Sequence, residues 1–91
     1  MVSRQRLWQI RNRVAIDRVL RDVQLPVKWS EGYLRFLCPL CREFHTATNP
    51  RTNLGRCFRC ERNFNPIDLV MVVERCTFLE AVERLAPLLV G

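Results

Sequence analysis

The chain has 91 residues, of which 48% are hydrophobic, and a formal net charge of +6 at pH 7. This length predicts a single domain over residues 1–91 with a small core, because so short a chain buries only roughly 60–65% of its unfolded surface. The longest apolar runs are far shorter than the roughly 20 residues that a membrane helix needs, and the N-terminus lacks the apolar core of a signal peptide, so we expect a cytoplasmic protein without membrane contact.

The positive charge is concentrated in two segments. Residues 1–25 and residues 35–62 each carry six arginines against two acidic residues, whereas residues 63–91 are mildly acidic. Arginine pairs with phosphate through a planar fork and stacks on bases, so this distribution favours a nucleic-acid partner. The alternative is an arginine-rich surface that reflects genome composition alone.

Residues 4–22 predict helical structure. Ser3 is a candidate N-cap, and Pro26 ends the segment. The apolar spacing loses its phase around Asn12 and Arg13, so one helix and two helices remain equally compatible with it. The residues expected to face the core are Leu7, Ile10, Val14, Ile16, Val19, Leu20 and Val23.

Residues 26–62 predict a zinc ribbon, which makes the fold class α+β: a small antiparallel sheet closed at one end by a metal ion, with helices on both sides. Residues 27–29 and 33–37 read as two strands joined by a turn at Ser30, Glu31 and Gly32. Residues 44–48 and 54–58 read as a second pair, with a turn over residues 49–53.

Four cysteines carry the strongest signal in this segment. They form a C-x2-C-x15-C-x2-C pattern, which is typical of a tetrahedral thiolate site for one zinc ion; the predicted ligands are Cys38, Cys41, Cys57 and Cys60. Disulfides would require an oxidising compartment. A rubredoxin-like iron site is a further alternative. In rubredoxins the residue after the second cysteine of each C-x2-C pair, or knuckle, is usually glycine, whereas this chain has Arg42 and Glu61 there.

Two further candidates for metal binding are set aside. His45 could be a fifth ligand, but four sulfurs already fill a structural site. Cys76 has no partner at metal spacing, and we expect a buried or half-buried thiol at a helix junction.

Residues 66–88 predict two helices. Asn65 is an N-cap candidate followed by Pro66, and Asp68 stands at the third helical position, where its charge favours the helix start. Thr77 and Glu80 form a second capping-box pattern. The last helix is expected to pack inward through Phe78, Ala81, Val82 and Leu85 and to be limited by Pro87.

From residue 15 onward the chain resembles the zinc-binding domain of bacterial DnaG-type DNA primases. The resemblance rests on the order and spacing of four motifs, which are Tyr33 to Pro39, Arg56 to Cys60, Asn65 to Met71, and Phe78 to Ala86. Most of the family has histidine as its second ligand, where this chain has Cys41. The family also tends to have glycines near the second knuckle, so we expect Asn63 or Asn65 to make the tight turn here.

The resemblance implies a DNA-binding module rather than an enzyme. A closed four-thiolate site is structural, and the sequence lacks a P-loop, a Ser/His/Asp set and the acidic metal cluster of nucleotidyl transfer. The implied partners are single-stranded template DNA and a separate primase catalytic domain. The residues predicted to contact DNA are Lys28, Arg35, Arg42, Arg51, Arg56 and Arg59, with Tyr33, Phe58 and also Trp29 as candidates for base stacking. For each aromatic residue the alternative is core packing, as we expect for Phe36 and Phe44.

A second hypothesis is a structural zinc ribbon that mediates protein–protein contacts. The apolar residues Val70, Val73, Leu88 and Leu89 exceed what so small a core clearly needs, so the C-terminal helices could form a docking surface. The two hypotheses differ in salt dependence, because only DNA binding should weaken steeply as salt rises.

Overall fold

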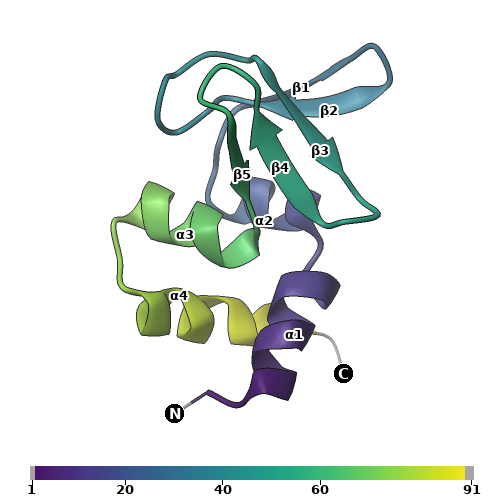
Figure 1. Cartoon of the computed structure of the whole chain (residues 1–91). Coiled ribbons are helices and arrows are strands. Elements are labelled where there is room, and N and C mark those ends of the chain that lie inside the picture. The colour runs from purple at the N-terminus through teal and green to yellow at the C-terminus, as the bar shows by residue number, and fades with distance from the viewer. Residues whose placement is uncertain (1, 90–91) are drawn as a thin grey trace.

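The computed structural model describes residues 2–89. Its strands form the upper part of the molecule in Figure 1 and its helices the lower part. The elements are α1 (Arg4–Arg13), α2 (Ile16–Asp22), β1 (Val27–Ser30), β2 (Tyr33–Phe36), β3 (Thr46–Asn49), β4 (Leu54–Cys57), β5 (Arg62–Phe64), α3 (Pro66–Glu74) and α4 (Phe78–Leu85), followed by a 3-10 turn at Ala86–Leu88. This is the α+β arrangement that the sequence predicts.

The N-terminal segment forms two helices. The break lies at Val14 and Ala15, whose backbones are not helical, and not at Asn12 and Arg13. Ser3 caps α1 as predicted, since its side chain accepts a hydrogen bond from the amide of Arg6. The break places two buried sets of apolar residues on differently oriented helices, which accounts for the change of phase in the sequence.

Asn53, in the turn between β3 and β4, stabilises this break through its side chain. Its Oδ1 accepts from the amide of Ile16 at 2.8 Å, and its Nδ2 donates to the carbonyls of Arg11 at 2.7 Å and Val14 at 2.8 Å. Asn53 is only 6% exposed and has a left-handed backbone with φ 56°, which asparagine adopts more readily than most residues. One side chain therefore satisfies backbone groups that the helix ends would otherwise leave unpaired.

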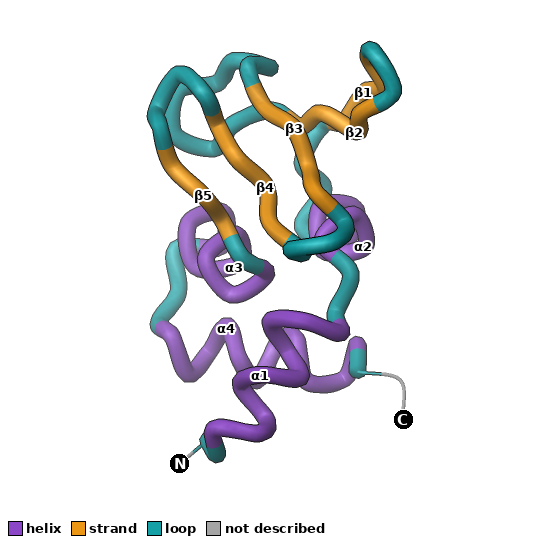
Figure 2. The backbone as a smooth tube through the Cα atoms, turned by 45° about the vertical axis from the view of Figure 1, so that its right-hand side comes forward, coloured by secondary structure: helices purple, strands orange, loops and turns teal. Residues whose placement is uncertain are grey.

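The strands form two small sheets rather than one. β1 and β2 pair in an antiparallel hairpin, while β3, β4 and β5 form a separate antiparallel sheet; Figure 2 shows the hairpin set beside β3. The β1–β2 turn has positive φ at both Glu31 and Gly32, as in the tight hairpin turns that match strand twist. β5 was not predicted, because a three-residue strand with one apolar residue has no clear alternation.

Thr46 joins the two sheets through its side chain. Its hydroxyl accepts from the amide of Phe36 at 2.8 Å and donates to the carbonyl of the same residue at 2.6 Å. Arg35 adds a bond from Nη1 to the carbonyl of Thr46 at 2.7 Å. Side-chain bonds thus replace a continuous backbone ladder between β2 and β3.

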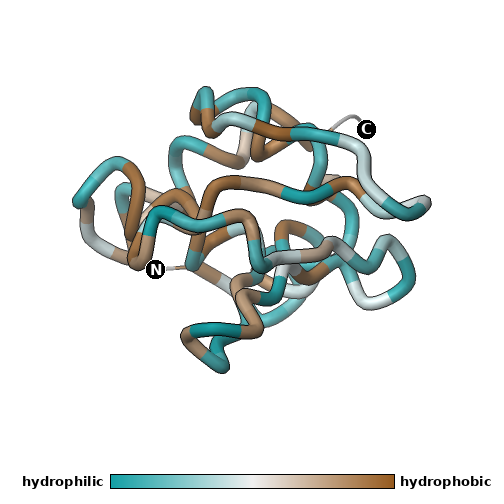
Figure 3. The backbone as a smooth tube through the Cα atoms, turned by 90° about the horizontal axis from the view of Figure 1, so that it is seen from above, coloured by the Kyte–Doolittle hydropathy of each residue, from teal (hydrophilic) through white to brown (hydrophobic). Residues whose placement is uncertain are grey.

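The core lies between the ribbon and the helices. Phe36 and Phe64 meet edge to face with ring centroids 6.3 Å apart, and a Cβ atom on Gly55 would come within 2.8 Å of the Phe36 ring. Phe36 is buried as expected, whereas Phe44 is only half-buried. Seen from above, hydrophobic segments cross the middle of the molecule, and several outer turns are hydrophilic (Figure 3).

The two C-terminal helices begin where the sequence predicts. Asn65 with Asp68, and Thr77 with Glu80, each make both hydrogen bonds of a capping box. On α4, Ala81, Val82 and Leu85 are buried. The expectation for Phe78 was wrong: it is the first residue of α4 and is 37% exposed.

Among the described residues, none of the helices has both the length and the apolar character that crossing a bilayer requires.

Candidate metal centre and nucleic-acid interface

Each cysteine pair lies where a strand runs into a tight loop. Cys38 follows β2 and Cys57 ends β4, and both are fully buried. In the first loop the amide of Leu40 donates to the sulfur of Cys38, and in the second the amide of Cys60 donates to the sulfur of Cys57, each at 3.4 Å. Both loops thus aim backbone donors at the buried sulfur, where they stabilise a thiolate.

The residue after each second cysteine has a left-handed backbone. Arg42 has φ 60° and Glu61 has φ 52°. The prediction that Asn63 or Asn65 would make the tight turn was wrong, because Asn63 pairs with Arg56 in the sheet and Asn65 is the extended N-cap of α3. The chain therefore makes the usual glycine conformation with charged, exposed residues.

The four sulfurs lie at tetrahedral spacing. Sγ of Cys38 is 3.9 Å from Sγ of Cys60, Sγ of Cys41 is 3.7 Å from Sγ of Cys57, and all four lie within 4.8 Å of one another. A zinc–sulfur distance of about 2.3 Å implies sulfurs about 3.8 Å apart in a regular tetrahedron. The cysteines are free thiols. The cluster therefore has the donors and the spacing to hold one zinc ion and no disulfide.

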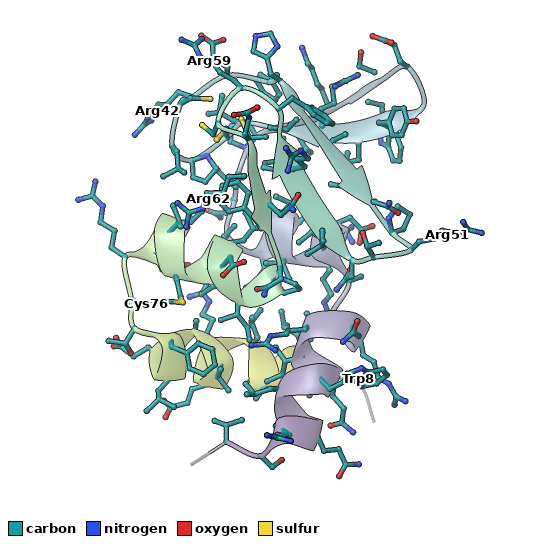
Figure 4. The ribbon with its side chains drawn as sticks, in the orientation of Figure 1. Trp8, Arg42, Arg51, Arg59, Arg62 and Cys76 are labelled. Carbon is teal, nitrogen blue, oxygen red and sulfur yellow. The ribbon has the colours of Figure 1, made fainter. Side chains whose placement is uncertain are left out.

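His45 and Cys76 stay outside this cluster. His45 is exposed and is not among the clustered ligands; its carbonyl accepts a hydrogen bond from the amide of Phe58 at 2.8 Å. Cys76 is half-buried between α3 and α4, as expected (Figure 4). Burial, followed by the carboxylates of Glu80 and Glu74, raises the pKa of its thiol.

A groove of about 1050 Å³ crosses the outward face of the three-stranded sheet. Its floor includes Arg56 and Asn63, which are register partners on β4 and β5 and are joined by a hydrogen bond of 3.2 Å. The β1–β2 hairpin contributes Trp29 and Tyr33, and Phe58 comes from the second cysteine loop, between Cys57 and Cys60. Trp29 is 74% exposed and Phe58 is 55% exposed, so core packing does not account for either ring.

The described chain matches a known zinc-binding family. The family model described as the CHC2 zinc finger, a zinc ribbon of DnaG type, matches residues 2–89. The chain belongs to the CHC2 zinc finger family. Two curated relatives are the DNA primase of Streptomyces coelicolor, 34% identical over 79 residues, and the DNA primase of Mycobacterium leprae, 36% identical over 80 residues. Each alignment covers 85% of this chain and 12% of the relative, so the chain spans a small part of their length. No solved structure gave a significant match.

This CHC2 zinc finger holds one structural zinc ion with an all-cysteine ligand set. Where most of the family has histidine, Cys41 supplies a fourth sulfur and one more negative charge. Without metal the thiols influence one another. Burial raises the pKa of Cys38. At Cys60, burial and then hydrogen bonds with neighbouring thiols raise the pKa to about 12. Burial acts in the same direction on Cys57, but the amide of Cys60 and the neighbouring thiols outweigh it and lower the Cys57 pKa. Four thiolates need a cation, which zinc supplies.

The CHC2 zinc finger brings only part of the predicted DNA-contact set together. Tyr33, Arg35, Arg56 and Phe58 line the groove. Arg35 is largely committed, because it binds the carbonyl of Thr46 and lies 3.8 Å from Glu31. Arg56 also lies over the Phe58 ring, 5.8 Å from its centroid.

The other four predicted residues lie elsewhere. Lys28 covers the ring of Phe44 at 4.7 Å, and Arg59 pairs with Glu43 at 3.6 Å. Arg42 and Arg59 lie at the metal end of the molecule, whereas Arg51 projects from the opposite end of the β3–β4 hairpin (Figure 4). The sequence reasoning placed all of them near ligand-bearing strands but could not assign faces. It missed Asn12, Arg13 and Asn63, which also line the groove. Asn63 is the register partner of Arg56 on β5, and because β5 was not predicted, this pairing could not be expected.

Proposed function

We propose that this CHC2 zinc finger engages single-stranded template DNA during replication and presents it to a separate primase catalytic domain for primer synthesis. The observation that carries the proposal is the groove on the outward sheet face. It combines the guanidinium of Arg56, which takes part in none of the ion pairs among residues 2–89, with three exposed rings, those of Trp29, Tyr33 and Phe58. The primase names of the two relatives support the same role and a place in the cytoplasm.

The groove suits single strands more than duplexes. An unpaired strand exposes its bases, which can stack on Phe58, Tyr33 or Trp29, and each stacked base is worth roughly 1–3 kcal/mol in single-strand binders. Arg56 supplies the phosphate contact, since arginine binds phosphate oxygens through its planar fork. These groups contact every sequence in the same way, so we expect weak sequence preference.

The zinc ion serves this groove by fixing one strand. Arg56 and Phe58 flank Cys57, one of the four ligands. A ligand held by the metal fixes the backbone on which both neighbours stand, so the zinc orients binding side chains without contacting DNA. With four thiolates bound, the ion has no open position for water or substrate, and we assign nucleotidyl transfer to the catalytic domain.

Fluorescence anisotropy with a labelled single strand of about 12 nucleotides tests the proposal, using protein whose zinc content has been measured. We expect log affinity to fall linearly with log salt and Arg56→Ala to weaken binding and flatten that slope. Arg75→Gly is the matched control, because it removes an exposed arginine outside the groove, from a left-handed position that glycine accepts. A folded, zinc-loaded protein that does not bind at low salt would contradict the proposal.

The alternative is a ribbon that docks other proteins. The residues first considered for it do not form a free surface: Val70 is fully buried, and Val73, Leu88 and Leu89 pack against the core. The described exposed apolar side chains on α4 are instead Phe78 and Leu79. Protein docking there predicts binding that depends little on salt and is lost in Leu79→Ser, while Arg56→Ala has no effect.

A further inference from the structure

We infer that the path for single-stranded DNA continues beyond the sheet onto α1, where Trp8 and Arg13 form a second contact. This inference rests on the proposed function. It adds that the chain binds a longer strand than the sheet face alone can hold, and it names the residues at the far end.

The first support is the continuity of the groove. Asn12, Arg13 and Ala15 line the same groove as Arg56 and Phe58. The lining therefore passes without interruption from the β1–β2 hairpin, across β3 and β4, to the junction of α1 and α2. Single-stranded DNA that leaves the sheet toward the α1–α2 junction next meets the end of α1.

The second support is the pair formed by Trp8 and Arg13. The guanidinium of Arg13 lies 5.5 Å from the centroid of the Trp8 ring, and Trp8 is 55% exposed. A large apolar ring that stays exposed to water forgoes the stabilisation that burial would give, so a binding partner that covers Trp8 would recover it. A tryptophan with an arginine over its face resembles the arrangement of Arg56 and Phe58 in the groove.

The third support is charge. α1 contains four arginines and no acidic residue. Among residues 2–89, Arg13 takes part in none of the ion pairs. Its positive charge is therefore available to a phosphate, and a polyanion is the partner that such a helix fits.

Asn53 explains why α1 can serve as part of a continuous surface. Its bonds to Arg11, Val14 and Ile16 tie the end of α1 to the turn between β3 and β4. Arg13 is thereby held at a fixed place relative to the sheet. In Figure 4, Trp8 lies on the same side of the view as Arg51, which projects from that turn.

A purely structural role for Arg13 makes a different prediction. Arg11 and Arg13 stand in the last turn of α1, where cations stabilise the helix dipole. In that case Arg13→Ala would lower the thermal midpoint but leave DNA affinity and its salt dependence unchanged, whereas the inferred contact changes both affinity and salt slope.

The two tryptophans of the chain make the test direct. Trp29→Phe leaves Trp8 as the single indole reporter at the far end of the path, and Trp8→Phe leaves Trp29 as the reporter at the sheet. With oligothymidylates from about 4 to about 16 nucleotides, we expect the shortest strands to quench Trp29 only and longer strands to quench Trp8 as well.

Affinity measurements complete the test. We expect Arg13→Ala to weaken binding of the longest strand about fivefold or more and to reduce the salt slope by about 0.7, the value for one phosphate on a single strand. Arg13→Lys should restore the slope. Arg75→Gly, which removes a charge outside the groove, should change the affinity and the slope much less than Arg13→Ala does.

The outcomes separate this inference from the proposed function. Trp29 quenching with no Trp8 quenching at any length, together with an unchanged Arg13→Ala slope, would overturn the inference and leave sheet binding intact. Absence of binding by both reporters in zinc-loaded protein would overturn the proposed function and this inference with it.

Discussion

At the scale of single residues, the four ligands differ in how much space surrounds them. Cys38 and Cys57 are fully buried, whereas Cys41 and Cys60 are half-buried. The position that most of the family fills with histidine is therefore one at which a larger ring can extend toward solvent. This accounts for the exchange of imidazole and thiolate at Cys41 without a change in the ribbon around it.

We predict that Cys41→His folds and binds one zinc ion, because imidazole is a good zinc ligand and the site has room for it. Cys57→His, at a fully buried ligand, should overpack the site and lose both metal and fold. Native mass spectrometry gives the metal stoichiometry of each variant, with circular dichroism as the check of folding. Equal zinc content in the two variants would show that burial does not decide the choice of ligand.

At the scale of elements, local signals in the sequence were the dependable ones. Both capping boxes, the hairpin turn at Gly32 and the knuckle spacing depend on residues at most a few positions apart, and the structure confirms them. The division into two sheets depends instead on the side chain of Thr46. The helix break depends on Asn53, almost 40 residues away. Composition gives no indication of such long-range polar contacts.

Asn53→Ala should destabilise the protein by at least about 2–3 kcal/mol, since it leaves the amide of Ile16 and two carbonyls without a partner and removing a buried partner costs roughly 1–3 kcal/mol. Urea unfolding measures the free energy. Asn53→Gly separates the causes, because glycine keeps the left-handed backbone and loses only the hydrogen bonds. A glycine variant as stable as the wild type would assign the cost to backbone conformation instead.

The capping box of α4 predicts a small pH dependence. The amide of Thr77, and then its side chain, hydrogen-bond to Glu80 and lower the pKa of this carboxylate below its ordinary value of 4.5. A lowered folded-state pKa stabilises the protein above the unfolded-state value, and this contribution is lost as pH falls through the folded value. Glu80→Gln should therefore be less stable than wild type at neutral pH and equally stable in acid. Thermal midpoints across this range provide the measurement; a difference that stays constant with pH would contradict the assignment.

At the scale of the whole molecule, a small core is combined with a metal site. The buried residues reach from α1 to the ribbon, and two of the zinc ligands, Cys38 and Cys57, belong to the same cluster. Zinc binding is worth on the order of 10–16 kcal/mol in zinc-finger peptides, which is comparable to the whole stability of an ordinary domain. That residues 1–91 fold as one domain stays a prediction. If it is correct, removal of the metal should unfold the core as well.

Chelation of zinc should therefore abolish the cooperative thermal transition of ribbon and helices together. Circular dichroism follows the loss, and added zinc should restore the transition. Cys76→Ser is the matched control, because it removes the one cysteine outside the cluster and should leave the response to chelator unchanged. Helices that melt at the same temperature with and without zinc would show that the two parts are independent.

One strand connects the two ends of this system. β4 begins directly after Asn53 and ends at Cys57, so four residues separate the clasp on the helices from the metal. β4 thus links the two sites directly, and we expect loss of zinc at its C-terminal end to loosen the Asn53 hydrogen bonds at its N-terminal end. The amide of Ile16, which that clasp protects, becomes a remote gauge of metal loading: its hydrogen exchange should accelerate when zinc leaves, although no ligand touches it.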